Sequence, residues 1–196
     1  MAVGHVETVD IVKRIWGIQT DMSSHNESST VFEASGSIII GNMFDADVEA
    51  MVNPVNCFAK AGRGLDELFR QRFPSNHEAF AARCGAGQVV PGKMDVHDLG
   101  ADAMPRWIIN FPTKRHWRDP SRLEDIESGL VDLRRVIVEL SIRSIAIPAL
   151  GCGLGGRDWA VVKPRIVAAL QDLPGVDISI FEPLPPKGQE RSAPPA

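Results

Sequence analysis

A group of basic side chains follows an apolar run near the middle of the chain. In "IINFPTKRHWR", residues 108–118, Lys114, Arg115, His116 and Arg118 stand close together. Positive charge at such density suits an anionic ligand, because opposite charges attract strongly at short range. A lysine amine can also act as a nucleophile, and a histidine can act as an acid or a base. The stretch therefore indicates anion binding, chemistry on an anionic substrate, or both.

Two glycine-rich segments, "AKAGRGL" and "LGCGLGG", offer a second kind of anion site. Their glycines are Gly62 and Gly64 in the first and Gly151, Gly153, Gly155 and Gly156 in the second. Glycine accepts positive φ angles, so consecutive backbone N–H groups can point at a phosphate. One such segment alone is more simply a tight turn, but two on adjacent strand ends favour a diphosphate. Neither segment fits the P-loop or the Rossmann fingerprint, which disfavours those nucleotide-binding classes.

The elements that must position these segments alternate between strands and helices. Six apolar runs are predicted strands, over residues 37–41, 48–53, 92–98, 106–111, 144–149 and 176–181. Helices are predicted over residues 62–84, 121–140 and 158–171. This alternation predicts a layered α/β domain around a largely parallel sheet. Ligands of such sheets bind at the carboxyl ends of the strands, so the basic stretch and both glycine segments should share one cleft.

Capping residues predict where two of the helices begin. Ser121 followed by Glu124 fits a capping box for the helix over residues 121–140. Asp158 is a suitable N-cap for the following helix, which Pro164 is expected to bend.

Composition limits the class of protein. The chain has 196 residues, a formal net charge of −4 and a pI near 5.7, which disfavours a general nucleic-acid binder. No apolar run is long enough to span a membrane and no secretory signal is recognisable, so we expect a cytoplasmic protein. Three widely spaced cysteines predict neither a disulfide framework nor a metal site, and no cofactor is expected. We expect one domain over residues 31–183, a partly disordered extension over 1–30 and a disordered Pro-rich tail over 184–196.

The order of four segments resembles a known family, the macrodomains that bind ADP-ribose. The segments are "GNMFDADVEAMVNPVN", "GRGL", "WIINFPTKRHWRDPSRLEDIESGL" and "IPALGCGLGGRDW", and the resemblance covers about residues 36–183. The third segment is the most specific and resembles the DarG-like branch, which removes ADP-ribose from DNA. The resemblance implies a three-layer α/β/α fold with a mixed central sheet. It also implies ADP-ribose in a cleft above the strand ends.

The resemblance also implies a set of ligand-binding residues. ADP-ribose would be bound by Asn42, Met43, Asn53, Asn56, Gly62, Arg63, Gly64, Leu65, Thr113, Pro148, Leu150, Gly151, Cys152, Gly153, Leu154, Gly155 and Phe181. Asn42 stands where many macrodomains carry an acid that contacts adenine, and Phe181 would stack on that base. Asn53 and Asn56 would lie near the distal ribose. Arg63 departs from the lysine that DarG-like sequences commonly carry in this loop.

Lys114 matches the lysine on which glycohydrolase activity depends in this branch. It could attack the C1″ carbon as a neutral amine, or stay an ammonium that orients the ribose and stabilises charge on the leaving base. Relatives that use a lysine carry an acid where this chain has Gly155, so the second catalytic group is unassigned. Two functions follow: a glycohydrolase acting on ADP-ribosylated DNA bases, and on modified protein carboxylates as a further substrate, or a reader that binds ADP-ribose without cleaving it.

The residues after Lys114 suggest a place for the DNA. His116, Trp117 and Arg118 combine an aromatic side chain with cations, which suits a base and the phosphates of a single strand. The alternative is that Trp117 packs under the following helix and the arginines are merely solvated. The expected partners are ADP-ribose and ADP-ribosylated DNA, with no membrane, and the protein is expected to be a monomer.

Overall fold

The computed structural model describes residues 36–60 and 62–183. The extension over 1–30 and the tail over 184–196 lie outside the described residues, so their predicted disorder stays a prediction. Six strands form one sheet: β1 (Gly36–Ile39), β2 (Ala50–Asn56), β3 (Asp95–Asp98), β4 (Trp107–Lys114), β5 (Ser144–Pro148) and β6 (Asp177–Phe181). Their spatial order is β1-β6-β5-β2-β4-β3. All neighbours are parallel except β3, which pairs antiparallel with β4, so the sheet is mixed and largely parallel.

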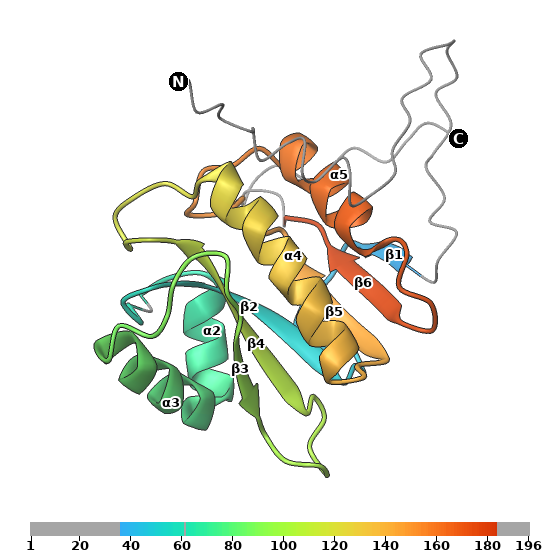
Figure 1. Cartoon of the computed structure of the whole chain (residues 1–196), viewed down its shortest axis with the longest axis horizontal. Coiled ribbons are helices and arrows are strands. Elements are labelled where there is room, and N and C mark those ends of the chain that lie inside the picture. The colour runs from blue at the N-terminus through green and yellow to red at the C-terminus, as the bar shows by residue number, and fades with distance from the viewer. Residues whose placement is uncertain (1–35, 61, 184–196) are drawn as a thin grey trace, which may run out of the picture. The chain divides into compact units, whose positions relative to one another are not determined.

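Helices cover both faces of this sheet. They are α2 (Leu65–Arg72), α3 (Pro74–Gly85), α4 (Leu123–Glu139) and α5 (Trp159–Leu170), with a short 3-10 turn, η1 (Met43–Asp45). Figure 1 shows α4 and α5 side by side across one face, while α2 and α3 lie beside β2, β4 and β3. No helix in residues 36–60 or 62–183 is long and apolar enough to cross a membrane.

Alternation along the strands separates the core into two layers. In β2, Ala50 and Val52 pack into the cluster beneath α4 and α5, whereas Met51 packs into a second cluster with Phe69 of α2. Successive strand side chains point to opposite faces, so continuous apolar runs can serve both layers. The predicted three-layer α/β/α architecture is confirmed.

Two sequence predictions about element boundaries were wrong. The helix predicted over 62–84 is two helices, because Pro74 lacks an N–H and disfavours a helical conformation for the residue before it. The strand predicted to stop at residue 111 continues to Lys114, since the apolar ladder with β2 persists through Pro112. The basic stretch therefore begins inside β4 rather than in a loop.

The predicted capping box was also wrong. Arg122 occupies the N-cap of α4 without a side-chain cap, and the Ser121 hydroxyl has no partner among the described residues. The backbone N–H of Ser121 instead donates to the Gly155 carbonyl at 2.9 Å, which ties Ser121 to the second glycine segment. By contrast, Asp158 caps α5 as predicted, with its carboxylate accepting from the Ala160 N–H at 2.9 Å.

Candidate functional site

Lys114 lies at the junction of the predicted cleft loops. It ends β4 opposite Asn56, the last residue of β2. Its Nζ donates to the Trp117 carbonyl at 2.7 Å and to the Leu154 carbonyl at 3.4 Å. One of these carbonyls belongs to the basic stretch and the other to the second glycine segment. The amine is therefore held in place by two loops that are distant in sequence.

The two glycine segments meet at the same point. Gly64 precedes α2 with φ of +77°, a backbone conformation that favours glycine. A Cβ placed on Gly64 would lie 3.8 Å from Leu154 Cδ1, so the segments are in contact. The Leu154 side chain is 68% exposed, which leaves it at the surface where the segments join. The fold thus brings together three segments that the sequence placed in one cleft.

Asn56 holds the first loop in shape. Its Oδ1 accepts from the N–H groups of Phe58 at 3.1 Å and Lys60 at 3.3 Å. Its Nδ2 donates to the Lys60 carbonyl at 3.2 Å. Both polar atoms of this side chain are therefore engaged within its own loop, and they support the backbone before the first glycine pair.

The second loop leaves no space for a side chain at Gly155. A Cβ there would lie 2.4 Å from the Gly151 carbonyl oxygen, closer than van der Waals contact allows. It would also meet the Ser121 Oγ. A catalytic acid cannot stand at this position without moving the loop backbone, so a second catalytic group has to come from elsewhere.

Comparison with known proteins identifies the fold family. A family model described as the macro domain matches residues 52–166, more than half of the chain. The chain belongs to the macro domain family. The solved macrodomain of Thermus aquaticus DarG has a TM-score of 0.73 and 48% identity, covering 76% of this chain and 98% of that one. Thermosipho africanus DarTG in complex with ADP-ribose has a TM-score of 0.72 and 31% identity, covering 79% of this chain and 43% of that one.

Curated relatives carry a further name. The DNA ADP-ribosyl glycohydrolase of Thermus aquaticus is 49% identical over 144 residues, which cover 74% of this chain and 40% of the relative. The protein of the same name from Mycobacterium tuberculosis is 49% identical over 152 residues, covering 78% of this chain and 42% of the relative. This macrodomain therefore spans about two fifths of the length of these relatives.

The predicted ligand residues of this macrodomain differ in how far they are exposed. Asn42, Gly62, Arg63, Gly64, Gly153 and Leu154 are exposed, and Leu65 and Cys152 are half-buried. Met43, Asn53, Asn56, Thr113, Pro148, Leu150, Gly151, Gly155 and Phe181 are buried. The buried residues can support the cleft, but they offer a ligand little side-chain surface in this conformation.

Three of these residues have duties inside the fold. Asn42 caps η1, accepting from the Phe44 N–H at 3.3 Å and donating to Asp45 Oδ1 at 2.9 Å. The Thr113 hydroxyl donates to the Val55 carbonyl at 3.3 Å. Phe181 is only 6% exposed and packs into the second core cluster, so stacking on adenine stays a prediction.

A buried amide row beneath the first loop was missed at the sequence level. Asn53 Nδ2 donates to Asn110 Oδ1 at 3.0 Å, and Asn110 exchanges hydrogen bonds with Asn76 at 2.8 and 3.2 Å. Asn53 Oδ1 is left without a partner among the described residues. The sequence signal was Asn110 inside the apolar run "WIINF". A buried amide needs hydrogen-bond partners, so its position indicated other polar side chains nearby.

Asp66 extends this row toward the first glycine pair and was also missed. Its Oδ1 accepts from Asn53 Nδ2 at 3.4 Å, in the first turn of α2 next to the first glycine pair. Burial raises the pKa of the Asp66 carboxyl above its ordinary value, although the hydrogen bond from Asn53 opposes that shift. A perturbed carboxyl beside a cleft is a frequent mark of a functional site.

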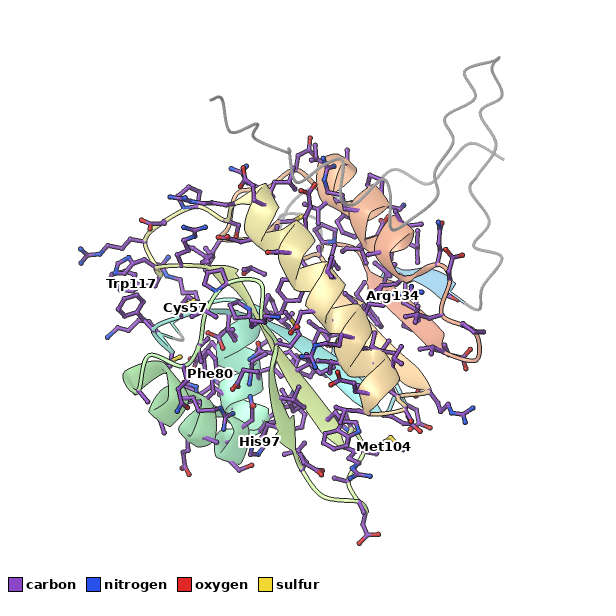
Figure 2. The ribbon with its side chains drawn as sticks, viewed as in Figure 1. Cys57, Phe80, His97, Met104, Trp117 and Arg134 are labelled. Carbon is purple, nitrogen blue, oxygen red and sulfur yellow. The ribbon has the colours of Figure 1, made fainter. Side chains whose placement is uncertain are left out.

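Aromatic and cationic side chains form a row beside Lys114. The rings of Phe58 and His116 are 4.9 Å apart, and those of His116 and Trp117 are 5.5 Å apart. The Arg118 guanidinium lies 4.4 Å from the Trp117 ring centre. Figure 2 shows Trp117 at the outer edge of the molecule, and 39% of it is exposed. Phe58, which is 61% exposed, is a member that sequence reasoning missed.

Proposed function

We propose that this macrodomain is an ADP-ribosyl glycohydrolase that removes ADP-ribose from modified bases in DNA. The observation that carries the proposal is the position of Lys114, whose amine is held where both glycine loops meet. The curated relatives named DNA ADP-ribosyl glycohydrolase support the choice of DNA, at 49% identity. The glycine loops would hold the diphosphate through backbone N–H groups, and Lys114 would face the distal ribose.

The two hydrogen bonds of Lys114 leave one position on its nitrogen for the substrate. An ammonium has three N–H groups, so two can satisfy the Trp117 and Leu154 carbonyls while the third meets the ribose or the leaving base. A neutral amine could donate to the same carbonyls and present its lone pair to C1″. Both routes fit the geometry. In either one, the carbonyls orient the reacting group before substrate arrives.

The aromatic row would hold the DNA near the bond to be cleaved. His116, Trp117 and Arg118 follow Lys114 and Arg115 in the chain, and the Phe58 ring contacts that of His116 from the first loop. Stacking on an aromatic ring contributes about 1–3 kcal/mol per base. An ADP-ribosylated protein carboxylate would be a further substrate for the same lysine.

The deciding experiment incubates the protein with single-stranded oligonucleotides ADP-ribosylated on thymine or on guanine. Mass spectrometry follows the release of free ADP-ribose. We expect release from one of them, and loss of release in Lys114→Ala with ADP-ribose binding retained in calorimetry. Lys114→Arg keeps the charge but not the nucleophile, so its activity separates the two routes. Borohydride reduction during turnover should trap a covalent adduct only if the amine attacks C1″.

A reader that binds ADP-ribose without cleaving it is the second candidate. It is favoured by the backbone at Gly155, which has no space for the acid found in other lysine-dependent relatives. In that case neither oligonucleotide nor ADP-ribosylated protein would release ADP-ribose, while calorimetry would still show binding.

A further inference from the structure

A pocket lies at the N-terminal end of α4, behind the second glycine loop. Its volume is about 560 Å³, and it is lined by Arg115, Pro120, Ser121, Arg122, Leu123, Glu124 and Arg157. Two backbone hydrogen bonds tie its wall to the loop: Ser121 N–H donates to the Gly155 carbonyl at 2.9 Å, and Arg157 N–H donates to the Gly151 carbonyl at 3.0 Å. The pocket therefore borders the loop that is expected to hold the diphosphate.

Unsatisfied polar groups are concentrated in this pocket. Within the described residues three buried side-chain atoms lack a hydrogen-bond partner, and two of them, Ser121 Oγ and Arg157 Nε, belong to pocket residues. Ser121 is only 1% exposed. Leaving a buried donor unpaired costs about 1–3 kcal/mol, more for a charged group. Both atoms are closed to solvent, so the chain leaves polar groups unsatisfied in the wall of this pocket.

The charges of the pocket favour an anion. Arg115 is paired with Asp125, at 2.9 Å for each of two hydrogen bonds, and Glu124 adds one negative charge. The guanidinium groups of Arg122 and Arg157 have no acceptor in the described part of the chain. The first turn of α4 has no side-chain cap, so its free N–H groups add partial positive charge.

The neighbouring surface indicates which anion fits. The chain leads directly from the aromatic row at His116, Trp117 and Arg118 to the pocket residues Ser121 and Arg122. Stacked rings suit an unpaired base, and arginines suit a phosphate through their paired N–H groups. A nucleic-acid strand supplies both groups in alternation, whereas a protein substrate supplies neither.

We propose that this pocket binds a backbone phosphate of the DNA strand that carries the ADP-ribosylated base. The inference rests on the proposed function and names the part of the substrate beyond ADP-ribose. Arg122 and Arg157 hold the phosphate, and the aromatic row takes the base next to it. An acidic protein thereby obtains its DNA contact from a local site, without a general basic surface.

The test compares a modified nucleoside alone with the same nucleoside flanked by phosphates and neighbouring nucleotides. One is the ADP-ribosylated nucleoside and the other is the same nucleoside inside a short single strand. In the wild-type protein kcat/KM should be higher for the strand. Arg122→Gln and Arg157→Gln should each reduce that preference about tenfold, the equivalent of one charged hydrogen bond. Arg143→Gln makes the same charge change at the exposed turn before β5, at the opposite end of the sheet, and should keep the preference.

Salt dependence of binding gives a readout that does not require turnover. For an unmodified short strand, the logarithm of the binding constant should fall linearly with the logarithm of the salt concentration. Removing one phosphate contact should make that slope shallower by about 0.7 relative to the wild-type protein. The reduced slope is expected for Arg122→Gln and not for Arg143→Gln. Arg122 is exposed, so its variant should fold even if that of Arg157 does not.

Distinct outcomes separate this inference from the proposed function. If the wild-type protein releases ADP-ribose from none of the modified strands, the glycohydrolase proposal fails. The salt slope alone then decides whether the pocket binds a phosphate. An unchanged substrate preference together with an unchanged slope in Arg122→Gln overturns the pocket and leaves the glycohydrolase standing. Weaker binding of free ADP-ribose in that variant would also overturn it, because the pocket would then belong to the ADP-ribose site.

Discussion

The two sides of the second glycine loop differ in how their polar groups are satisfied. On the cleft side, Lys114 Nζ bonds two carbonyls, and both polar atoms of Asn56 are engaged within the first loop. The exception there is Asn53 Oδ1 in the amide row beneath that loop. On the α4 side, Ser121 Oγ and Arg157 Nε have no partner among the described residues. The cleft is therefore held in shape by the protein itself. The wall of the pocket behind it has polar groups that the described protein leaves unsatisfied.

The largest expected effect comes from filling the loop that separates the two sides. Gly155→Ala places a methyl group 2.4 Å from the Gly151 carbonyl oxygen, so the loop backbone must move. We expect a loss of about 3 kcal/mol in unfolding free energy, together with loss of ADP-ribose binding. Thermal unfolding and calorimetry measure the two. Gly153→Ala is the matched control, because a Cβ at Gly153 meets nothing within 4 Å.

Removing the support of the first loop should have the next largest effect. Asn56→Ala leaves the N–H groups of Phe58 and Lys60 without their acceptor and should cost about 2 kcal/mol in unfolding free energy. ADP-ribose affinity should fall as well, since the following glycine pair loses its anchor. Asn56→Asp keeps the accepting oxygen, so denaturant unfolding should show a smaller loss. Equal losses in the two variants would contradict a loop-shaping role.

The buried carboxyl of Asp66, next to the first glycine pair, should lower the stability of the folded protein at neutral pH. Burial raises the pKa of this carboxyl in the folded state, so the folded protein binds the proton more tightly than the unfolded chain. The stabilising contribution of that proton is fully present below the unfolded pKa of about 3.9 and is lost as pH rises through the folded value. At neutral pH the wild-type protein therefore bears the cost of the buried charge.

Asp66→Asn should remove that cost. We expect a higher unfolding temperature than the wild type at neutral pH, and a difference that shrinks in acid as the wild-type carboxyl takes up its proton. Asp47→Asn, at an exposed position, makes the same charge change and should not reproduce this profile. A gain in stability accompanied by a loss of turnover would show that the carboxyl is retained for function.

The fold was largely predictable because its signals are local. The strands that became β1, β5 and β6 are short apolar runs with branched side chains, and their alternation with amphipathic helices leaves few arrangements. Pro74 could have predicted the break between α2 and α3, but the helical periodicity on both sides of it suggested one helix. Patterns of this kind fix an element's type better than its ends.

The site was predictable only where backbone geometry decides it. Glycines at the strand ends marked both loops, and the surrounding motif marked Lys114, whose catalytic role stays a prediction. The contact of Phe58 with His116 joins two loops that follow different strands, and no local pattern contains it. Similarly, the amide row forms because Asn76 of α3 contacts Asn110 of β4, and these two residues are far apart in the sequence.

The smallest expected effect comes from Ser121, which precedes α4 as Asp158 precedes α5. A side chain that caps a helix contributes about 1 kcal/mol, and Asp158→Ala should lose that amount because its carboxylate accepts from the Ala160 N–H. Ser121→Ala should lose less than about 0.5 kcal/mol in unfolding free energy, because its hydroxyl bonds nothing in the described protein and its removal ends the cost of an unpaired buried group. Denaturant unfolding of the two variants side by side measures the difference. A loss of similar size in both would mean that Ser121 caps α4 after all, and that the α4 side of the loop is satisfied from within the chain like the cleft side.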